Sequence, residues 1–220
     1  MKKSLIIPAR PPVFCSWASA GGKMESEGPL ARGFDILDAT DRFGKETWEQ
    51  SESEMQRRVF SLALGKAGLK DTDIGAVFAG DLMNQCVGST YGLLPFDLPY
   101  FGLYGACSTA VEGLILSSLA LESGHFEHTA AVTSSHFYSS ERQFRYPVEY
   151  GGQRAPTSQW TVTGAGAFIL GHHSPHAGPC VAITALLPGR VCEKGITDLN
   201  NMGAAMAPVS VKLRPYPVRK

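Results

Sequence analysis

The sequence has little excess charge, no long apolar run and no paired cysteines, and each of these shortages excludes a class of protein. Its 20 Lys and Arg residues balance 20 Asp and Glu residues, so no overall field attracts nucleic acid. No uninterrupted run of about eighteen apolar residues is present, which excludes a membrane-spanning helix by length. Pro8 and Arg10 interrupt the apolar run that a signal peptide needs. We therefore expect no nucleic-acid partner, no secretion signal and only peripheral contact with a membrane.

The cysteines are odd in number, and none of them forms the close pairs that are typical of zinc or redox sites. They are Cys15, Cys86, Cys107, Cys180 and Cys192. Cytoplasmic thiols are the expected state of such a set. A cluster of His172, His173 and His176 lies in a proline-containing loop, where a solvated turn fits better than a metal site without a fourth ligand. We expect no metal site and no cofactor held by the protein itself.

Strand-like and helix-like segments alternate along most of the chain. Residues 1–45 are rich in Gly and Pro and predict an irregular opening segment with one short strand at 12–17. Apolar spacing and capping residues then predict helices over 47–67 and 108–122, a short helix that ends at 94, and strands over 74–80, 99–106, 128–135, 161–171 and 180–191. The alternation predicts an α/β fold with a mostly parallel sheet and helices on both faces.

Polar residues follow the carboxyl ends of three predicted strands, which is where ligands of such sheets bind. Asp81 follows the first of these strands, Cys107 the second and His136 the third. The segment 137–160 is too long for an ordinary connection and predicts a functional loop or an insertion. We therefore expect the site around these strand ends.

Cys107 carries the strongest local signal, because it directly precedes a predicted helix together with Ser108. Backbone N–H groups and the positive end of the helix dipole favour a thiolate there and can bind an anion. A buried structural thiol is the alternative, since free cysteines are usually core residues. The glycines between 163 and 171 lack the spacing of a nucleotide-binding loop, and close packing of strands explains them better.

Several short blocks occur in a recognisable order between Phe14 and Pro208. They are Gly80-Asp-Leu-Met-Asn-Gln, Gly105-Ala-Cys-Ser-Thr, Ser134-Ser-His, Glu141-Arg-Gln-Phe-Arg-Tyr-Pro-Val-Glu-Tyr-Gly-Gly-Gln, Thr161-Val-Thr-Gly-Ala-Gly-Ala, Gly195-Ile-Thr-Asp and Met202-Gly-Ala-Ala-Met-Ala-Pro. The block that begins at Glu141 is far more specific than the common Gly-Ala-Cys-Ser element. Together these blocks resemble the stage V sporulation protein AD family of the thiolase-like superfamily.

The resemblance implies a thiolase-like fold of two pseudo-symmetric halves, of which residues 46–208 would form mainly the first, with an insertion at about 137–160. It also implies binding of dipicolinic acid (pyridine-2,6-dicarboxylate) for its uptake, with calcium, into the developing spore during sporulation, without catalytic turnover. Calcium would accompany the ligand, because no EF-hand loop offers a site of its own. The implied partners are membrane-embedded stage V sporulation proteins of the same operon, and a homodimer is compatible with the family. The implied location is cytoplasmic and peripheral to the forespore or spore inner membrane.

Carried over onto this chain, the ligand site would include Asp81 and Cys107, with Ser108, Asn84, His136, Arg142 and Arg145 as further candidates. Backbone N–H groups at Ser108 and a guanidinium fork suit a planar dianion. The two arginines can equally form surface pairs with Glu141 and Glu149, and His136 can be a structural histidine. A carboxylate at Asp81 would repel the dianion unless it is protonated, accepts from a neighbouring donor, or binds calcium shared with the ligand.

Two alternatives to ligand binding stay open. In an acyltransferase of the thiolase or ketoacyl synthase kind, Cys107 would be the nucleophile and form a thioester. The histidines that activate such a cysteine belong to the second half of the fold, which this chain lacks. After Pro208, the tail 209–220 no longer resembles the family, and a truncated or frameshifted reading frame would explain it. A nonfunctional truncated fragment is therefore the other alternative, with apolar faces exposed where the second half would cover them.

Overall fold

The structure is a computed structural model of the 220-residue chain, and it describes residues 5–144, 160–173, 180–191, 193, 195–197, 203–204 and 206. Its helices are α1 (Lys23–Glu27), α2 (Trp48–Ala67), α3 (Val87–Leu93), α4 (Thr109–Glu122) and α5 (Phe137–Phe144). Short 3₁₀ turns are η2 (Ala31–Gly33), η3 (Asp71–Asp73), η4 (Asn84–Cys86) and η5 (Ala106–Ser108). The strands are β1 (Val13–Gly21), β2 (Ile36–Leu37), β3 (Ala76–Gly80), β4 (Tyr100–Gly102), β5 (His128–Ser135) and β6 (Gly164–Gly171).

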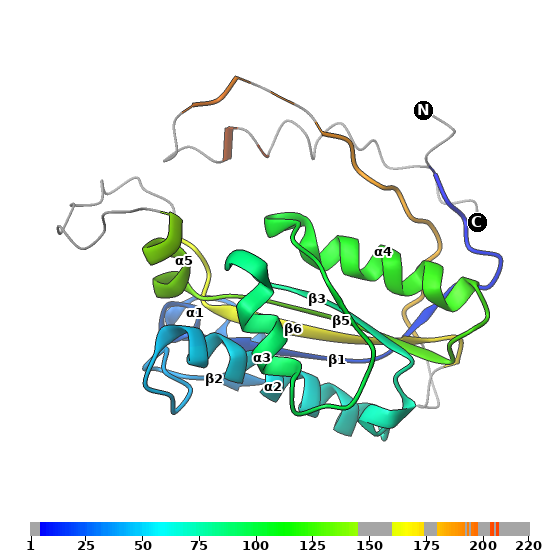
Figure 1. The fold of residues 1–220 in the computed structure, drawn as a ribbon, viewed down its shortest axis with the longest axis horizontal. Helices are drawn as coiled ribbons and strands as arrows, with labels where there is room; N and C mark the ends of the chain where they lie inside the picture. The colour runs from blue at the N-terminus through cyan, green and yellow to red at the C-terminus, as the bar shows by residue number, and fades with distance from the viewer. Residues whose placement is uncertain are drawn as a thin grey trace.

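The six strands form one sheet in the order β2-β1-β6-β5-β3-β4, and helices cover both of its faces (Figure 1). α2 and α3 lie on one face, and α4 lies on the other. Side chains of β3 alternate between the faces. Val77 and Ala79 belong to the larger core cluster, which also contains Val59 of α2, whereas Phe78 packs in a smaller cluster with Leu116 of α4. The expected α/β class with helices on both faces is confirmed.

The sheet is mixed, whereas the sequence predicts a mostly parallel one. β1 pairs with β2 in parallel, and β3 pairs in parallel with β4 and β5, but β6 is antiparallel to both of its neighbours. The reason lies in the connection from β5 to β6. Ser135 at the end of β5 pairs with Gly164 at the start of β6, so the chain leaves β5 and enters β6 at the same end of the two strands. Such a connection joins antiparallel strands, because a parallel pair needs a crossover.

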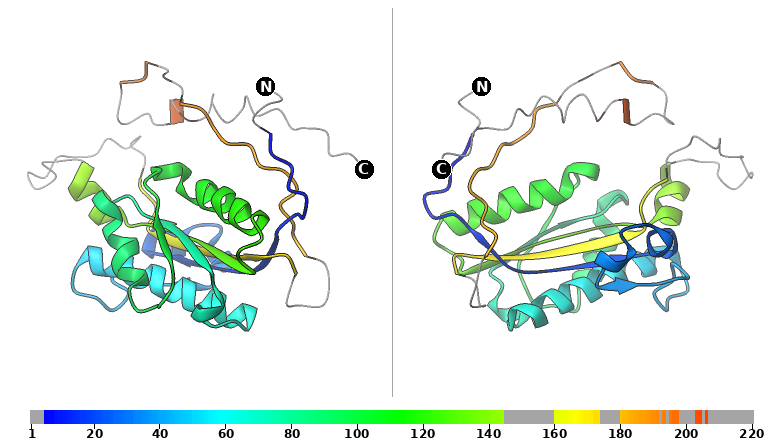
Figure 2. Two further views of the ribbon diagram at one scale, coloured as in Figure 1. Left: turned by 45° about the vertical axis from the view of Figure 1, so that its right-hand side comes forward. Right: turned by 180° about the vertical axis from the view of Figure 1, so that it is seen from behind.

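Three further expectations about strands differ from the structure. The strand predicted at 12–17 is present as β1, but it extends to Gly21 and lies inside the sheet, which the sequence does not indicate because its small Ala, Ser and Gly residues conceal the alternation. β4 is a three-residue edge strand and not a buried one, and Phe101 within it is 52% exposed. Residues 180–191 form no strand and make only isolated bridges, from Leu186 to Ile6 and from Ala182 to Val13. Figure 2 shows this segment running beside the start of the chain near one end of α4.

Local signals set the limits of α2. The hydroxyl Oγ1 of Thr47 accepts from Gln50 N at 3.2 Å, and Gln50 Oε1 accepts from Thr47 N at 3.4 Å, which forms a capping box. Gly68 ends the helix with a φ of 68°, a left-handed conformation that costs glycine little. The predicted helix over 47–67 is therefore confirmed almost to the residue.

None of the helices in the described ranges combines the length and the apolar character that crossing a bilayer requires.

Candidate functional site

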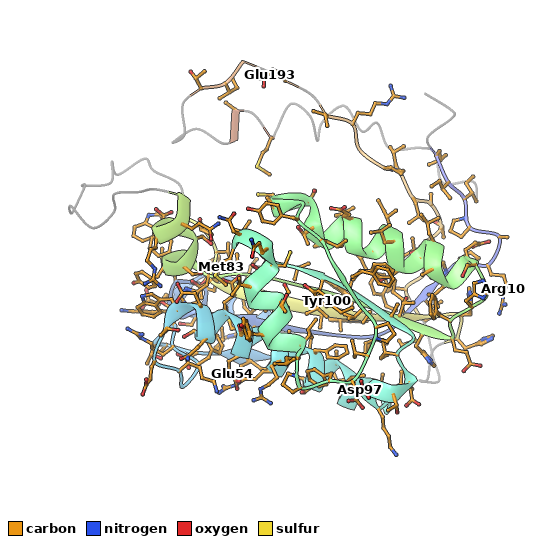
Figure 3. The ribbon with its side chains drawn as sticks, viewed as in Figure 1. Arg10, Glu54, Met83, Asp97, Tyr100 and Glu193 are labelled. Carbon is orange, nitrogen blue, oxygen red and sulfur yellow. The ribbon has the colours of Figure 1, made fainter. Side chains whose placement is uncertain are left out.

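The described candidate residues that follow β3 and β5 lie at the same end of the sheet. β3 and β5 run in parallel and end together, since Gly80 pairs with Thr133. The segment that follows β3 leads through Met83, labelled in Figure 3, into η4 and α3. The segment that follows β5 leads into α5. A hydrogen bond from Asn84 N to Gln143 Oε1, 3.2 Å long, joins these two segments.

Asp81 faces the interior of the protein. It is 1% exposed, and its carboxylate accepts from Met83 N at 2.8 Å, from Ser89 N at 2.7 Å and from Ser89 Oγ at 2.6 Å. Of the three conditions considered for this carboxylate, acceptance from neighbouring donors is the one that the structure shows. Asp81 therefore holds the segment from residue 81 to residue 89, which we call the 81–89 loop, and its carboxylate is not at the surface.

The 81–89 loop contains two consecutive non-glycine residues in the left-handed region, Gln85 with a φ of 60° and Cys86 with a φ of 53°. Such conformations cost free energy and persist where the surroundings hold them. Asn84 stands directly before them and is exposed, and its Oδ1 accepts from Tyr104 OH at 3.0 Å. Asn84 thus connects the loop to the segment that leads to Cys107.

Cys107 is exposed and stands in η5, directly before α4. Its neighbour Ala106 has a φ of 48°, a second point of left-handed backbone at this edge of the sheet. The N–H of Ser108 donates to Gly105 O at 3.1 Å and its Oγ donates to the same carbonyl at 2.8 Å, so this residue stabilises the turn. Glu112 in the first turn of α4 adds a negative charge beside the start of the helix, which opposes the binding of a dianion there.

His136 has the environment of a structural histidine, which is one of the two alternatives, although its buried Nδ1 has no hydrogen-bond partner. Its side chain is fully buried, and Nε2 lies 2.8 Å from Asp41 O. The ring also lies against Trp48, with ring centroids 5.3 Å apart. Burial lowers the pKa of His136, so the neutral form that donates to the carbonyl is favoured.

Of the two candidate arginines, the structure describes only Arg142. Arg142 is half exposed and its Nη2 pairs with Glu49 Oε1 on α2, so its guanidinium is already engaged by the protein. A surface ion pair is thus the alternative that the structure supports for Arg142, although the partner is Glu49 and not Glu141 or Glu149. Arg145 lies outside the described residues.

A buried polar cluster beneath the site was not foreseen. Its centre is Glu52 on α2, a fully buried carboxyl whose Oε1 accepts from Ser134 Oγ and whose Oε2 accepts from Ser139 Oγ, both at 2.8 Å. Burial, and then the charge of Asp81, raise the pKa of Glu52 to about 8. The sequence contains a signal for this cluster, because Glu52 and Gln56 lie four residues apart on the stripe that continues with Val59 and Ala63.

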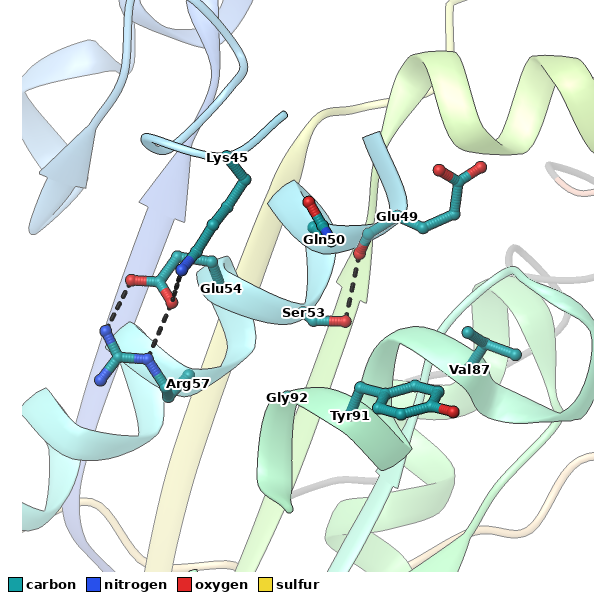
Figure 4. Close-up of a pocket in the computed structure, with 9 residues that line it drawn as sticks. All are labelled: Lys45, Glu49, Gln50, Ser53, Glu54, Arg57, Val87, Tyr91 and Gly92. Carbon is teal, nitrogen blue, oxygen red and sulfur yellow. Dashed lines mark hydrogen bonds and ion pairs between the residues drawn. The ribbon is translucent and has the colours of Figure 1, made fainter. Parts of the chain in front are cut away.

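A groove of about 570 Å³ lies between α2 and α3, and it borders the expected site at Glu49, the partner of Arg142, and at Val87 of the 81–89 loop. It is lined by Lys45, Glu49, Gln50, Ser53, Glu54, Arg57, Val87, Tyr91 and Gly92. Figure 4 shows that Lys45 and Arg57 converge on the carboxylate of Glu54, which also pairs with Arg58. The hydrogen bond from Arg57 is the main reason that the pKa of Glu54 falls to about 2. The two basic residues that line the groove, Lys45 and Arg57, are thus already paired with Glu54.

Metal ligands are not grouped in the described part of the chain, where no three His, Cys, Asp or Glu side chains are arranged to hold an ion.

Comparisons with known proteins agree with the resemblance. The sequence profile of the family described as Stage V sporulation protein AD (SpoVAD) matches residues 2–214, which extends past Pro208 into the tail that was expected to diverge. Stage V sporulation protein AD of Bacillus subtilis (strain 168) is 38% identical over 200 residues. That match covers 90% of this chain and 58% of the relative, so the chain spans less than two thirds of the length of that protein.

Solved structures with a similar fold are more distant. OleA H285N of Xanthomonas campestris has a TM-score of 0.49 at 14% identity, over 73% of this chain and 56% of that chain. The 3-oxoacyl-(acyl carrier protein) synthase III FabH of Xanthomonas oryzae pv. oryzae KACC10331 has a TM-score of 0.46 at 16% identity, over 73% and 56% of the two chains. The family profile and the identity to the Bacillus protein decide the assignment: the chain belongs to the stage V sporulation protein AD family.

Proposed function

We propose that this chain is a non-catalytic thiolase-like protein that binds dipicolinic acid for its uptake, with calcium, into the developing spore. Membership of the stage V sporulation protein AD family is the observation that carries the proposal. The ligand would lie at the exposed edge formed by Cys107 and Asn84, beside Tyr104. The aromatic ring of Tyr104, which is 57% exposed, offers a flat wall to a pyridine ring, and the amide of Asn84 offers a donor to a carboxylate.

The geometry around the site sets two conditions on this binding. Asp81 and His136 act through the structure and do not touch the ligand, because both are buried and engaged. Glu112 repels a dianion at the start of α4, so calcium bound to the ligand would reduce the repulsion. We therefore expect dipicolinate to bind more tightly with calcium than without it.

Calorimetric titration with dipicolinic acid, with and without calcium, tests the proposal. Saturation near one ligand per chain is expected, with at least about tenfold weaker binding in Cys107→Trp, where the indole would fill the site. Cys180→Trp is the matched control, because Cys180 is also exposed but lies in another part of the chain. The absence of binding by a folded chain would overturn the proposal and favour the alternative of a nonfunctional fragment.

Acyl transfer is the second candidate, and the exposure of Cys107 at the start of α4 favours it. In that case the thiolate would attack the carbonyl carbon of an acyl thioester, the carrier thiol would leave, and the acyl group would remain on Sγ. Intact-mass analysis after incubation with acyl-CoA separates the two candidates. A stable adduct that is absent in Cys107→Ala would establish the enzyme and contradict the binding-only proposal.

We further propose that the protein works at the forespore or spore inner membrane with membrane-embedded stage V sporulation proteins of the same operon. A homodimer belongs to this proposal. The exposed edge of β4, with Phe101 and Tyr104 beside it, offers unpaired backbone groups to a second copy. Co-purification from sporulating cells with the membrane fraction, and its loss when those membrane proteins are deleted, would test the location.

A further inference from the structure

Two buried carboxyl groups beneath the candidate site are joined by one glutamine. Gln56 Nε2 donates to Ser134 Oγ at 2.7 Å and to Ser89 Oγ at 2.9 Å. Each serine hydroxyl in turn donates a hydrogen bond to a carboxyl oxygen, from Ser134 to Glu52 and from Ser89 to Asp81. Every hydroxyl in this chain has one hydrogen to donate, and each is used. The cluster therefore has a single direction, from Gln56 outward to Glu52 and to Asp81.

The cluster ties together four separate elements. Glu52 and Gln56 lie on α2, Ser134 on β5 and Ser139 on α5, while Ser89 lies on α3 and holds the 81–89 loop through Asp81. Glu52, Gln56, Ser89 and Ser139 are at most 2% exposed. The elements that carry Asn84 and Arg142 are thus both fastened, directly or through Gln56, to one turn of α2.

From this arrangement we propose that Glu52 is a positioning residue that is held as a neutral carboxylic acid and sets the 81–89 loop and α5 in place at the candidate site. The titratable groups that face it are Asp81, after β3, and Glu49, one turn earlier on α2, and both are acidic. The guanidinium of Arg142, on α5, pairs with Glu49 and not with Glu52. The hydroxyls of Ser134 and Ser139 stabilise a charge on Glu52 only in part, so burial and the charge of Asp81 favour the proton on Glu52.

The neighbouring hydroxyls can accommodate the proton without leaving a donor unpaired. Ser139 Oγ lies 2.8 Å from Glu52 Oε2 and 3.1 Å from His136 O. When Oε2 carries the proton, it donates to Ser139 Oγ, and Ser139 donates to His136 O. Ser134 continues to donate to Oε1. Every polar hydrogen of Glu52, Ser134 and Ser139 then has an acceptor, which is the condition for a stable buried polar group.

The first test is the pH dependence of stability in the whole chain. The folded pKa of Glu52, about 8, lies above the unfolded value of about 4.3, so its contribution is complete below pH 4.3 and is lost as the pH rises through 8. Relative to Glu52→Gln, which keeps a neutral side chain of the same shape, the unfolding constant of the natural chain should rise up to about tenfold per pH unit between about pH 5 and pH 8.

Glu54→Gln is the matched control, because Glu54 lies on the same helix and its folded pKa of about 2 contributes no slope above pH 5. The natural chain and Glu54→Gln should therefore lose stability in parallel, while Glu52→Gln stays flatter. Identical slopes of stability against pH in all three proteins would contradict the proposal that Glu52 is neutral.

The second test measures the positioning of the loop through the alkylation of Cys86 at pH 7. Cys86 is buried at the end of η4, and its Sγ donates to Leu103 O at 3.1 Å. Glu52→Ala should speed this alkylation at least about tenfold and Glu52→Gln should restore the natural rate, while Cys15, buried elsewhere, stays unchanged in all variants. Equal changes at both cysteines, or none at Cys86, would contradict a positioning role.

A third measurement rests on the proposed function. Affinity for dipicolinate should fall at least about fivefold in Glu52→Ala and return in Glu52→Gln. If the natural chain binds no dipicolinate, the proposed function fails, whereas the stability and alkylation tests still decide the role of Glu52.

Discussion

At the scale of single residues, two polar side chains that follow neighbouring strands have opposite environments. Asp81 is buried and accepts three hydrogen bonds, whereas Cys107 is exposed beside the start of α4. The local sequence around the two residues is similar, since each follows an apolar run and precedes a helix. The difference arises from what packs around them: Ser89 of α3 covers Asp81, while in the described part of the chain Cys107 stays at the surface.

Replacement of Asp81 by Asn should destabilise the protein by about 3 kcal/mol, because an amide cannot accept from three donors as a carboxylate does and leaves a buried donor unpaired. Urea denaturation measures the change. Asp97→Asn serves as the control, since Asp97, labelled in Figure 3, is exposed and should change stability by less than about 0.5 kcal/mol. Equal stability of the two variants would show that the Asp81 cluster does not hold the loop.

Iodoacetamide should modify Cys107 in the folded protein and leave Cys15 intact. Burial raises the pKa of Cys15 from 9.0 to about 11, which by itself lowers the thiolate fraction about a hundredfold. Peptide mapping by mass spectrometry at pH 8 distinguishes the two sites. Denatured protein is the reference, in which the two cysteines should react at similar rates. Rapid modification of Cys15 in the native state would contradict the burial.

At the scale of elements, the start of α2 is set by local capping residues, whereas the positions of its acidic side chains are set by tertiary contacts. Thr47 and Gln50 close its first turn, and Glu49 is the only acidic residue in that turn. Glu52 and Glu54 follow on the same helix but lie beyond its first turn and have other partners. Glu52 faces the core, and Glu54 is buried among Lys45, Arg57 and Arg58. The face on which a charged residue falls matters more here than its distance from the N-terminus.

Loss of the capping hydroxyl in Thr47→Ala should lower the free energy of unfolding by about 1 kcal/mol, because Gln50 N loses its acceptor. Thr47→Ser keeps an acceptor oxygen and should retain most of the stability. Thermal denaturation followed by circular dichroism compares the variants with the natural chain. A loss in the serine variant as large as that in the alanine variant would assign the effect to packing of the methyl group instead.

At the scale of the whole molecule, the two faces of the sheet are covered unequally. Ser16 Oγ donates to Ala63 O on α2, so the adjacent Trp17 points to the opposite face, where it is 53% exposed beside Phe14. On the same side of the sheet, Val111 of α4 is 59% exposed.

We expect the chain to associate with itself at micromolar concentrations through this apolar face. The double variant Trp17→Lys and Val111→Lys should shift sedimentation velocity profiles toward smaller species, because two buried charges oppose this contact and leave the edge of β4 unchanged. Tyr91→Lys is the control, since Tyr91 is 64% exposed in the groove between α2 and α3 on the other face. A monomeric natural chain at all concentrations would contradict the expectation.

Local sequence patterns determined where the helices and strands of this protein lie in the chain, but not how they pair and pack with one another. The limits of α2 and β5 and the α/β alternation follow from residues a few positions apart, through caps, glycines and apolar spacing. The antiparallel direction of β6, the edge position of β4 and the burial of Glu52 depend on contacts between segments far apart in the chain. Only the tertiary structure decided them, because pairing in a sheet and burial of a side chain are set by what the folded chain brings alongside.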